Sequence, residues 1–184
     1  MEKQKTIKNT IHFSGKGIHT GVFTKMTLIP AKENNGIVFV RTDKDNTRVK
    51  ANVENIYSTE RSTNLKKNNV FVKTVEHILA AIVGNNIDNV DILINNEEVP
   101  ILDGSAKEFS EKITSAGVVK QKSCKYIYNI EKEIYYKDEE SGTEIIIKPD
   151  DEYNIDVTID YNSHTLGIQK SNLSSLKNFN DEIA

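Results

Sequence analysis

The feature that most constrains the fold is one amphipathic helix set among strand-forming segments. Its apolar residues recur at i, i+3, i+4 and i+7, the spacing of a single helix face: Val75, Ile78, Leu79 and Ile82. We expect Thr74 to cap the start of this helix and Gly84 to end it. A helix with one apolar face needs a second layer of structure to bury that face.

The segments around this helix are predicted to supply that layer. Strands are expected where β-branched and aromatic residues gather or polarity alternates, at residues 5–13, 22–29, 37–41 and 89–94. A turn is expected at residues 14–17. A second helix is predicted to open with a capping box at 105–108, to bury Phe109 and Ile113, and to end at Gly117. Residues 1–122 are therefore predicted to form an α+β domain, a two-layer α/β sandwich.

A second, incomplete domain of similar kind is predicted for residues 123–184. Antiparallel strands are expected at residues 126–136, 143–148 and 153–161. Beyond His164 we expect only a short helix that starts at Asn180. Strands without a covering layer would leave one sheet face exposed. We therefore interpret this part as the first strands of a truncated domain.

Composition excludes several classes of protein. The net charge of −3 gives no general attraction to nucleic acid. The longest apolar run, residues 78–83, is too short for a transmembrane segment, and no secretory signal is recognised at the start. Cys124 is the only cysteine, which excludes an internal disulfide and a thiolate metal cluster. We expect a cytoplasmic protein.

The strongest candidate for chemistry is the Thr-Val-Glu-His segment at residues 74–77. If Thr74 caps the helix, Glu76 and His77 lie in its first turn, off the apolar face. The positive end of the helix dipole favours a charged carboxylate and a neutral imidazole. These are the forms that a general base and a metal ligand need. The pair therefore suits a metal-dependent hydrolase, although such pairs also occur for structural reasons and one histidine cannot hold zinc.

Other polar residues leave two interpretations open. His19 lies in Gly-Ile-His-Thr-Gly at 17–21, which is either a substrate-facing loop or, the reading we favour, a tight turn. Asp103 precedes the second helix and either forms a turn, again the favoured reading, or orients a catalytic group. His12 and His164 have no evident partner for catalysis.

Four segments taken together resemble one known family. Residues 17–21, 74–79, 87–89 and 99–105 are similar, in order and spacing, to the UDP-3-O-acyl-N-acetylglucosamine deacetylases. The resemblance continues over residues 157–164. There the family often has Asp-Phe-Asn-His, whereas this chain has Asp-Tyr-Asn-Ser-His.

The resemblance implies a function and residue roles. Members of the family remove the N-acetyl group of UDP-3-O-acyl-N-acetylglucosamine by zinc-dependent hydrolysis, in the cytoplasm, during lipid A biosynthesis. Each of their two domains is an α+β sandwich. On this chain the resemblance assigns the general base to Glu76 and one Zn²⁺ ligand to His77. It makes Ile18 and His19 candidates for contact with the small-molecule substrate, and Asp103 a candidate for a supporting role at the site.

The chain also departs from the family. The other two zinc ligands of the family come from a His-Lys-x-x-x-Asp segment, which this sequence lacks. A proton-donating His and the Thr of an Arg-Thr-Phe segment are also missing. Because a catalytic zinc needs three protein ligands, we expect this chain to be inactive alone. It is either part of a deacetylase, or a non-catalytic binding protein of that family, which could pair with a separate chain carrying the second-domain ligands.

Overall fold

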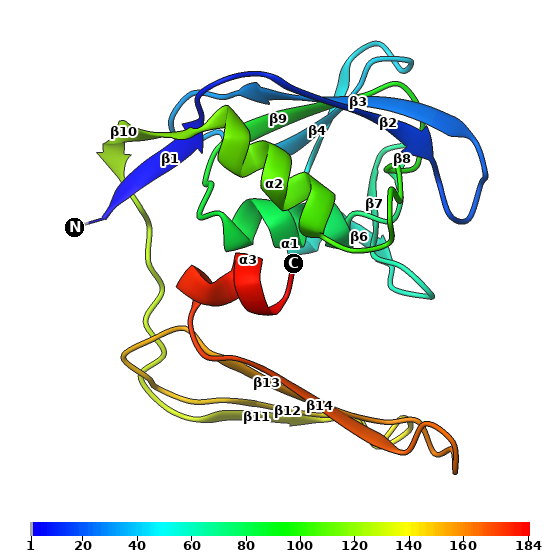
Figure 1. Cartoon of the computed structure of the whole chain (residues 1–184), viewed down its shortest axis with the longest axis vertical. Coiled ribbons are helices and arrows are strands. Elements are labelled where there is room, and N and C mark those ends of the chain that lie inside the picture. The colour runs from blue at the N-terminus through cyan, green and yellow to red at the C-terminus, as the bar shows by residue number, and fades with distance from the viewer. Residues whose placement is uncertain (1) are drawn as a thin grey trace. The chain divides into compact units, whose positions relative to one another are not determined.

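The computed structural model describes residues 2–184, which divide into two compact units (Figure 1). The first unit consists of the chain up to Lys125 together with Lys177–Ala184, and the second is Tyr126–Leu176. The expected boundary between residues 122 and 123 falls inside a strand, β10 (Val118–Cys124). The terminal segment Lys177–Ala184, predicted as part of the second domain, belongs to the first compact unit.

A five-stranded sheet forms one layer of the first unit. Its strands, in spatial order, are β2 (Ile11–Lys16), β3 (Phe23–Pro30), β9 (Val90–Ile94), β4 (Ile37–Arg41) and β5 (Thr47–Lys50). Neighbouring strands are antiparallel, except that β4 and β9 are parallel. Alternate side chains of β9 are buried, at Val90, Ile92 and Ile94. The sheet therefore turns one continuous apolar face towards the second layer.

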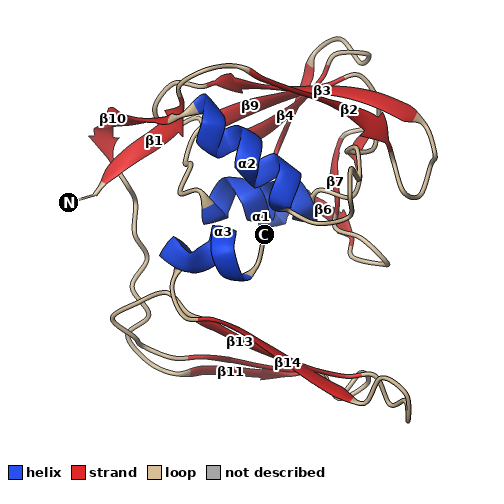
Figure 2. Ribbon diagram, viewed as in Figure 1, coloured by secondary structure: helices blue, strands red, loops and turns tan. Residues whose placement is uncertain are grey.

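Two helices form the second layer, on one side of the sheet (Figure 2). These are α1 (Glu76–Gly84) and α2 (Lys107–Ala116). The predicted apolar residues Ile78, Ile82 and Ile113 are fully buried. Phe109 of α2 packs on Phe13 of β2, with ring centroids 5.0 Å apart. The predicted α+β sandwich is confirmed.

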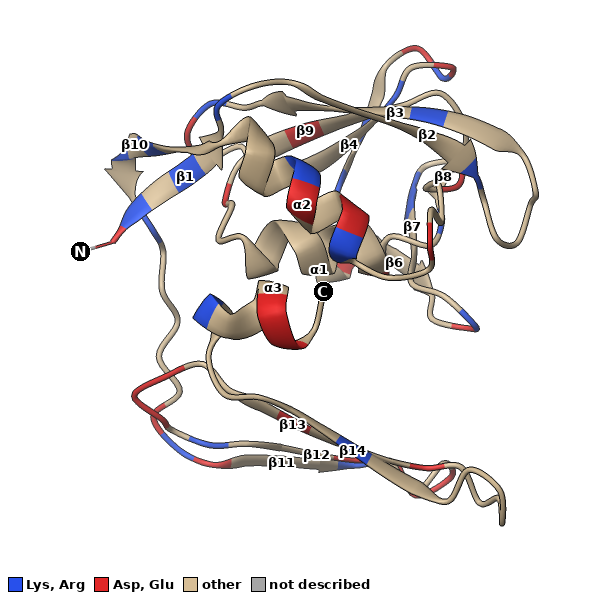
Figure 3. Ribbon diagram, in the orientation of Figure 1, with Lys and Arg blue, Asp and Glu red and all other residues tan. Residues whose placement is uncertain are grey.

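Smaller elements complete the first unit. The first strand, β1 (Lys3–Ile7), pairs antiparallel with β10. A three-stranded sheet consists of β6 (Ile56–Ser58), β7 (Asn64–Lys67) and β8 (Val70–Val72), after a 3₁₀ turn at Val53–Asn55. The last helix, α3 (Phe179–Glu182), brings the buried ring of Phe179 against Gly84 at the end of α1. Charges of both signs lie along the same elements, as on α2 (Figure 3).

The second unit contains two antiparallel hairpins. One pairs β11 (Ile134–Lys137) with β12 (Glu144–Ile147), and the other pairs β13 (Ile155–Asp160) with β14 (Ile168–Leu173). A 3₁₀ turn at Leu176–Asn178 follows. The strand β14 was not predicted, because its centre, Gln-Lys-Ser-Asn, lacks the apolar residues that indicate a strand. Most side chains of these strands are exposed.

Three local predictions are wrong. Thr74 does not cap α1: Val75 precedes the helix and makes no side-chain cap, while Thr74 has a left-handed φ of 57°. Residues 105–108 do not form a capping box, because Glu108 pairs with Lys112 instead. The turn expected at 14–17 begins later, because β2 stays paired with β3 as far as Lys16. The expected helix ends at Gly84 and Gly117 are confirmed.

Candidate functional site

Glu76 and His77 occupy the first two positions of α1, and both side chains are half-buried. The Glu76 Oε2 atom accepts a hydrogen bond of 2.9 Å from the backbone N–H of Thr63. Within residues 2–184, the Glu76 Oε1 atom and the His77 ring make no hydrogen bond. One carboxylate oxygen and an imidazole are therefore available next to each other at the helix start.

The three-stranded sheet fixes the chain just before α1. The backbone N–H of Val75 donates to the carbonyl of Thr63, at 3.2 Å, and that of Thr74 donates to the Asn64 side chain, at 3.3 Å. Thr63 thus has two contacts here. Its carbonyl accepts from Val75 in the segment before the helix, and its N–H donates to Glu76. These bonds help to hold Thr74 in its left-handed conformation, which is unfavourable for a β-branched residue.

A buried carboxylate that no sequence pattern indicates, Glu98, lies beside this segment. Glu98 is only 1% exposed, and its carboxylate accepts hydrogen bonds from the backbone of His19 and Thr20 and from the hydroxyls of Thr20 and Thr74. Burial raises the pKa of Glu98, but these hydrogen bonds outweigh it and hold the pKa below its ordinary value. The charge pattern Asn-Asn-Glu-Glu predicts only a polar turn and does not distinguish Glu98 from Glu97.

The Gly-Ile-His-Thr-Gly segment is a compact loop closed over that carboxylate. The backbone N–H of Gly21 donates to the carbonyl of Gly17, at 3.1 Å, which confirms a tight turn. A Cβ atom at Gly17 would lie 2.1 Å from Glu98 Oε2, so only glycine fits there. Ile18, 60% exposed, and His19 point outward. Their contact with a substrate stays a prediction.

Asp103 forms the turn before α2. Its Oδ1 atom accepts hydrogen bonds from the backbone N–H and the hydroxyl of Ser105, at 3.0 and 2.9 Å, and these bonds lower its pKa. Within residues 2–184 it makes no hydrogen bond to Glu76 or His77. A role in orienting a catalytic group therefore stays a prediction.

The Ile-Asp-Asn segment at 87–89 is a structural junction. Asn89, 1% exposed, donates to the side chains of Gln4 and Gln121, at 2.9 and 2.7 Å, and accepts from the N–H of Gly36. Asp88 accepts from the backbone N–H of Lys5 at 2.7 Å. This motif thus joins β1 and β10 to the five-stranded sheet.

The residues present fit part of a zinc site. An imidazole without hydrogen bonds beside a carboxylate is a suitable donor and base, but a catalytic zinc needs three ligands. Among residues 2–184, no group of three or more His, Cys, Asp or Glu side chains lies close enough to hold a metal ion. None of the helices in that range is long and apolar enough to span a membrane.

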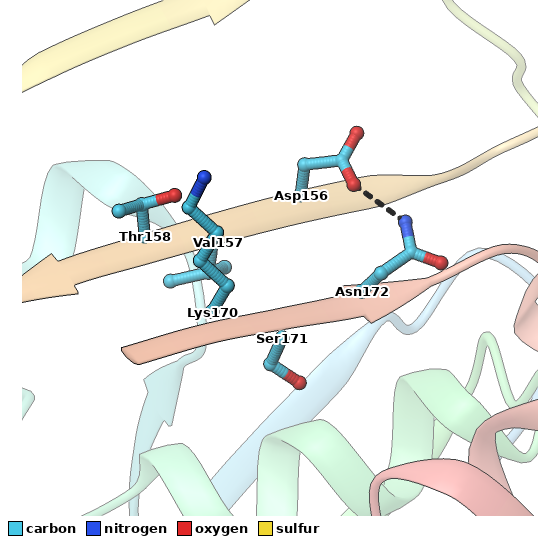
Figure 4. A pocket seen from close by; sticks show the side chains of 6 residues that line it. All are labelled: Asp156, Val157, Thr158, Lys170, Ser171 and Asn172. Carbon is cyan, nitrogen blue, oxygen red and sulfur yellow. Dashed lines mark hydrogen bonds between the residues drawn. The ribbon is translucent and has the colours of Figure 1, made fainter. Parts of the chain in front are cut away.

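One shallow hollow lies elsewhere, along the β13–β14 hairpin (Figure 4). Its volume is about 370 Å³, and its lining residues are Asp156, Val157, Thr158, Lys170, Ser171 and Asn172. A hydrogen bond of 2.6 Å joins Asn172 to Asp156 across the pair of strands. None of the predicted site residues lines it.

The class that these features define is an α+β sandwich domain that presents a carboxylate beside an imidazole at a helix start. Comparison with known proteins specifies it further. The model of the LpxC family, UDP-3-O-acyl N-acetylglycosamine deacetylase, matches residues 4–184, and the chain belongs to this family.

Relatives agree with this assignment. The bifunctional enzyme LpxC/FabZ of Bacteroides thetaiotaomicron is 40% identical, over 100% of this chain and 40% of its own length. The UDP-3-O-acyl-N-acetylglucosamine deacetylase of Nitratiruptor sp. is 36% identical, over 99% of this chain and 60% of its own. That of Chlamydia caviae is 39% identical, over 98% of this chain and 65% of its own. The chain thus spans only part of the length of these relatives.

Proposed function

We propose that this chain supplies the general base and one zinc ligand of a deacetylase. The reaction would be hydrolysis of the N-acetyl group of UDP-3-O-acyl-N-acetylglucosamine, with release of acetate, in cytoplasmic lipid A biosynthesis. The observation that carries the proposal is the adjacent pair at the start of α1, where residues 2–184 give one Glu76 carboxylate oxygen and the His77 imidazole no hydrogen bond. Family membership and the names of the relatives support it.

The geometry of Glu76 suits proton transfer. Its Oε2 atom is held by the Thr63 N–H, which fixes the plane of the carboxylate. Its Oε1 atom is then the one to take a proton from the attacking water. His77, in the first turn of α1, would donate a ring nitrogen to the metal. When bound, the metal supplies Lewis-acid polarisation of the acetamide carbonyl.

The resemblance assigns the two remaining ligands to the His and the Asp of a His-Lys-x-x-x-Asp segment, and this sequence contains no such segment. We therefore propose that residues 1–184 are inactive alone and act as part of a longer protein or beside a complementing chain. A second candidate is a non-catalytic binding protein of the same family. The exposed side chains of the second-unit strands favour it, because an uncovered sheet face can bind another chain.

The coding DNA should be sequenced beyond codon 184, and both the 184-residue chain and any longer product assayed for zinc content and acetate release. A longer product with the His-Lys-x-x-x-Asp segment is expected to release acetate only with zinc present, and the shorter chain to release none. His77→Gln should abolish release, whereas His12→Gln, an exposed histidine on β2, should not. Zinc-dependent release by the 184-residue chain would refute the proposed incompleteness. An inactive longer product would refute the proposed reaction.

A further inference from the structure

Glu98 is a buried carboxylate without a neighbouring cation. Within residues 2–184, no Lys, Arg or His nitrogen forms an ion pair with it, although it is 1% exposed. Its neighbour Glu97 is half-buried and pairs with Lys73 at 2.7 Å in the ordinary way. A buried charge without an opposite charge is costly unless hydrogen-bond donors surround it. The hydrogen-bond donors around Glu98 therefore identify the segments of the chain that its carboxylate joins.

Those donors come from two segments far apart in the sequence. Oε1 accepts from the His19 N–H, at 2.9 Å, and from the Thr74 hydroxyl, at 3.1 Å. Oε2 accepts from the N–H and the hydroxyl of Thr20, at 2.7 and 2.6 Å. The first segment carries the predicted substrate residue His19, and the second leads directly into Glu76 and His77.

We infer that Glu98 is a positioning residue, which binds the loop at residues 17–21 to Thr74 and so fixes His19 relative to the start of α1. Three of the four hydrogen bonds join Glu98 to the loop, so the Glu98 carboxylate mainly stabilises the position of the loop. Only one part of this role rests on the proposed function, namely that the loop and the start of α1 face the same substrate.

The backbone around Glu98 is held without its side chain. The N–H of Lys73 donates to the carbonyl of Glu97, and that of Val99 donates to the carbonyl of Lys73, at 2.7 and 3.1 Å. The N–H of Ile101 donates to the carbonyl of Lys16, at 3.0 Å. Removal of the carboxylate should therefore leave the sandwich folded and release the loop.

The decisive experiment is residue-resolved amide hydrogen exchange on this chain, comparing Glu98→Gln with the matched control Glu97→Gln. Glutamine keeps the shape but replaces one acceptor oxygen by an NH₂ group, which cannot accept the bonds from Thr20 or His19. In Glu98→Gln the amides of His19 and Thr20 should exchange at least about tenfold faster, because hydrogen bonds to charged groups are among the stronger ones. The amide of Ile92, in the sheet, should be unchanged, and Glu97→Gln should resemble wild type.

Unchanged exchange at His19 and Thr20 in folded Glu98→Gln would overturn the inference, as would equal acceleration at Ile92, which would show a general loss of stability. If Glu98→Gln does not fold, Thr20→Val decides, because it removes one donor and keeps the carboxylate. It should accelerate exchange at His19, and no change there would equally overturn the inference.

Kinetics on a longer product that carries the His-Lys-x-x-x-Asp segment distinguish positioning of the loop from general stabilisation of the fold. Glu98→Gln should raise KM about tenfold and leave kcat and its pH profile within about threefold of wild type, because the released loop weakens substrate binding. A general loss of folded protein would lower kcat at unchanged KM, and that result would overturn the substrate-positioning role. A complete protein without deacetylase activity would refute the proposed function instead, and the exchange experiment would still decide the structural role of Glu98.

Discussion

Two carboxylates beside Thr74 differ in the number of donors that surround them. Within the part of the chain that the structure describes, Glu98 accepts four hydrogen bonds, which occupy both of its oxygens, whereas Glu76 accepts one, on Oε2, and none on Oε1. A carboxylate whose oxygens are all engaged cannot readily accept a proton from water. This difference is why we propose Glu76, rather than Glu98, as the general base.

Substitution of the proposed base should separate catalysis from metal binding. In the complete protein, Glu76→Gln should lower kcat by about 10²–10⁴-fold, the usual contribution of a general base, and should retain zinc. His77→Gln should lose both the activity and the bound zinc. Steady-state kinetics and zinc analysis check both. A Glu76→Gln protein with near wild-type kcat would exclude Glu76 as the base.

The ionisation of Glu98 should make stability depend on pH. Its pKa is lowered from the ordinary 4.5, because its hydrogen bonds outweigh the effect of burial. Its charged form therefore stabilises the folded state above about pH 4.5, and this stabilisation is lost as the pH falls through the lower, folded-state pKa. Urea unfolding between pH 7 and pH 3 should show that wild type loses its advantage over Glu98→Gln towards acid pH. A constant difference between the two would contradict this assignment.

Among the elements, the periodicity of apolar residues predicted the helices and strands of the sandwich, but it did not predict how the helices begin. The spacing of Ile78 and Ile82 located α1, and polarity patterns located β4 and β9, because burial on one face dictates those residues. The predicted N-terminal cap of α1 is wrong, since the Thr74 hydroxyl donates to Glu98, a partner distant in sequence. The Glu76–His77 pair was visible locally, whereas the role of Glu98 depends on contacts that no local pattern records.

The contact between α1 and α3 gives a prediction at this scale. A Cβ atom at Gly84 would lie 2.1 Å from the Phe179 ring, so Gly84→Ala should displace α3 and destabilise the first unit. In a Phe179→Ala background the clash disappears, and the same change should become neutral or stabilising, because alanine favours helix by about 1 kcal/mol over glycine. Thermal melts of the four proteins test this. Equal effects of Gly84→Ala in both backgrounds would refute the clash.

At the scale of the whole molecule, the two units differ in the structure that supports them. The first unit buries a core between sheet and helices, whereas the second consists of two separate hairpins whose side chains are mostly exposed. The exposed surface of the second unit was expected from sequence, but the strand β14 and the return of the chain to the first unit were not. A polar strand carries too little local signal, and the short terminal helix, which was expected from Asn180, does not show by its sequence which unit it joins.

Amide exchange should reveal this difference. Isolated two-stranded hairpins are marginally stable in water, so the amides of β11–β14 should exchange far faster than those of β9. Exchange of the whole chain, followed by mass spectrometry with peptic fragments, measures both units in one sample. Equal protection in β9 and β13 would contradict this prediction.

The return of the chain to the first unit also orders events during protein synthesis. The chain leaves that unit at Lys125 and re-enters it at Lys177. A nascent polypeptide can therefore assemble the five-stranded sheet with α1 and α2 while the ribosome is still translating the hairpins. The packing of Phe179 against Gly84 can therefore form only after the hairpins of the second unit, Tyr126–Leu176, have been translated.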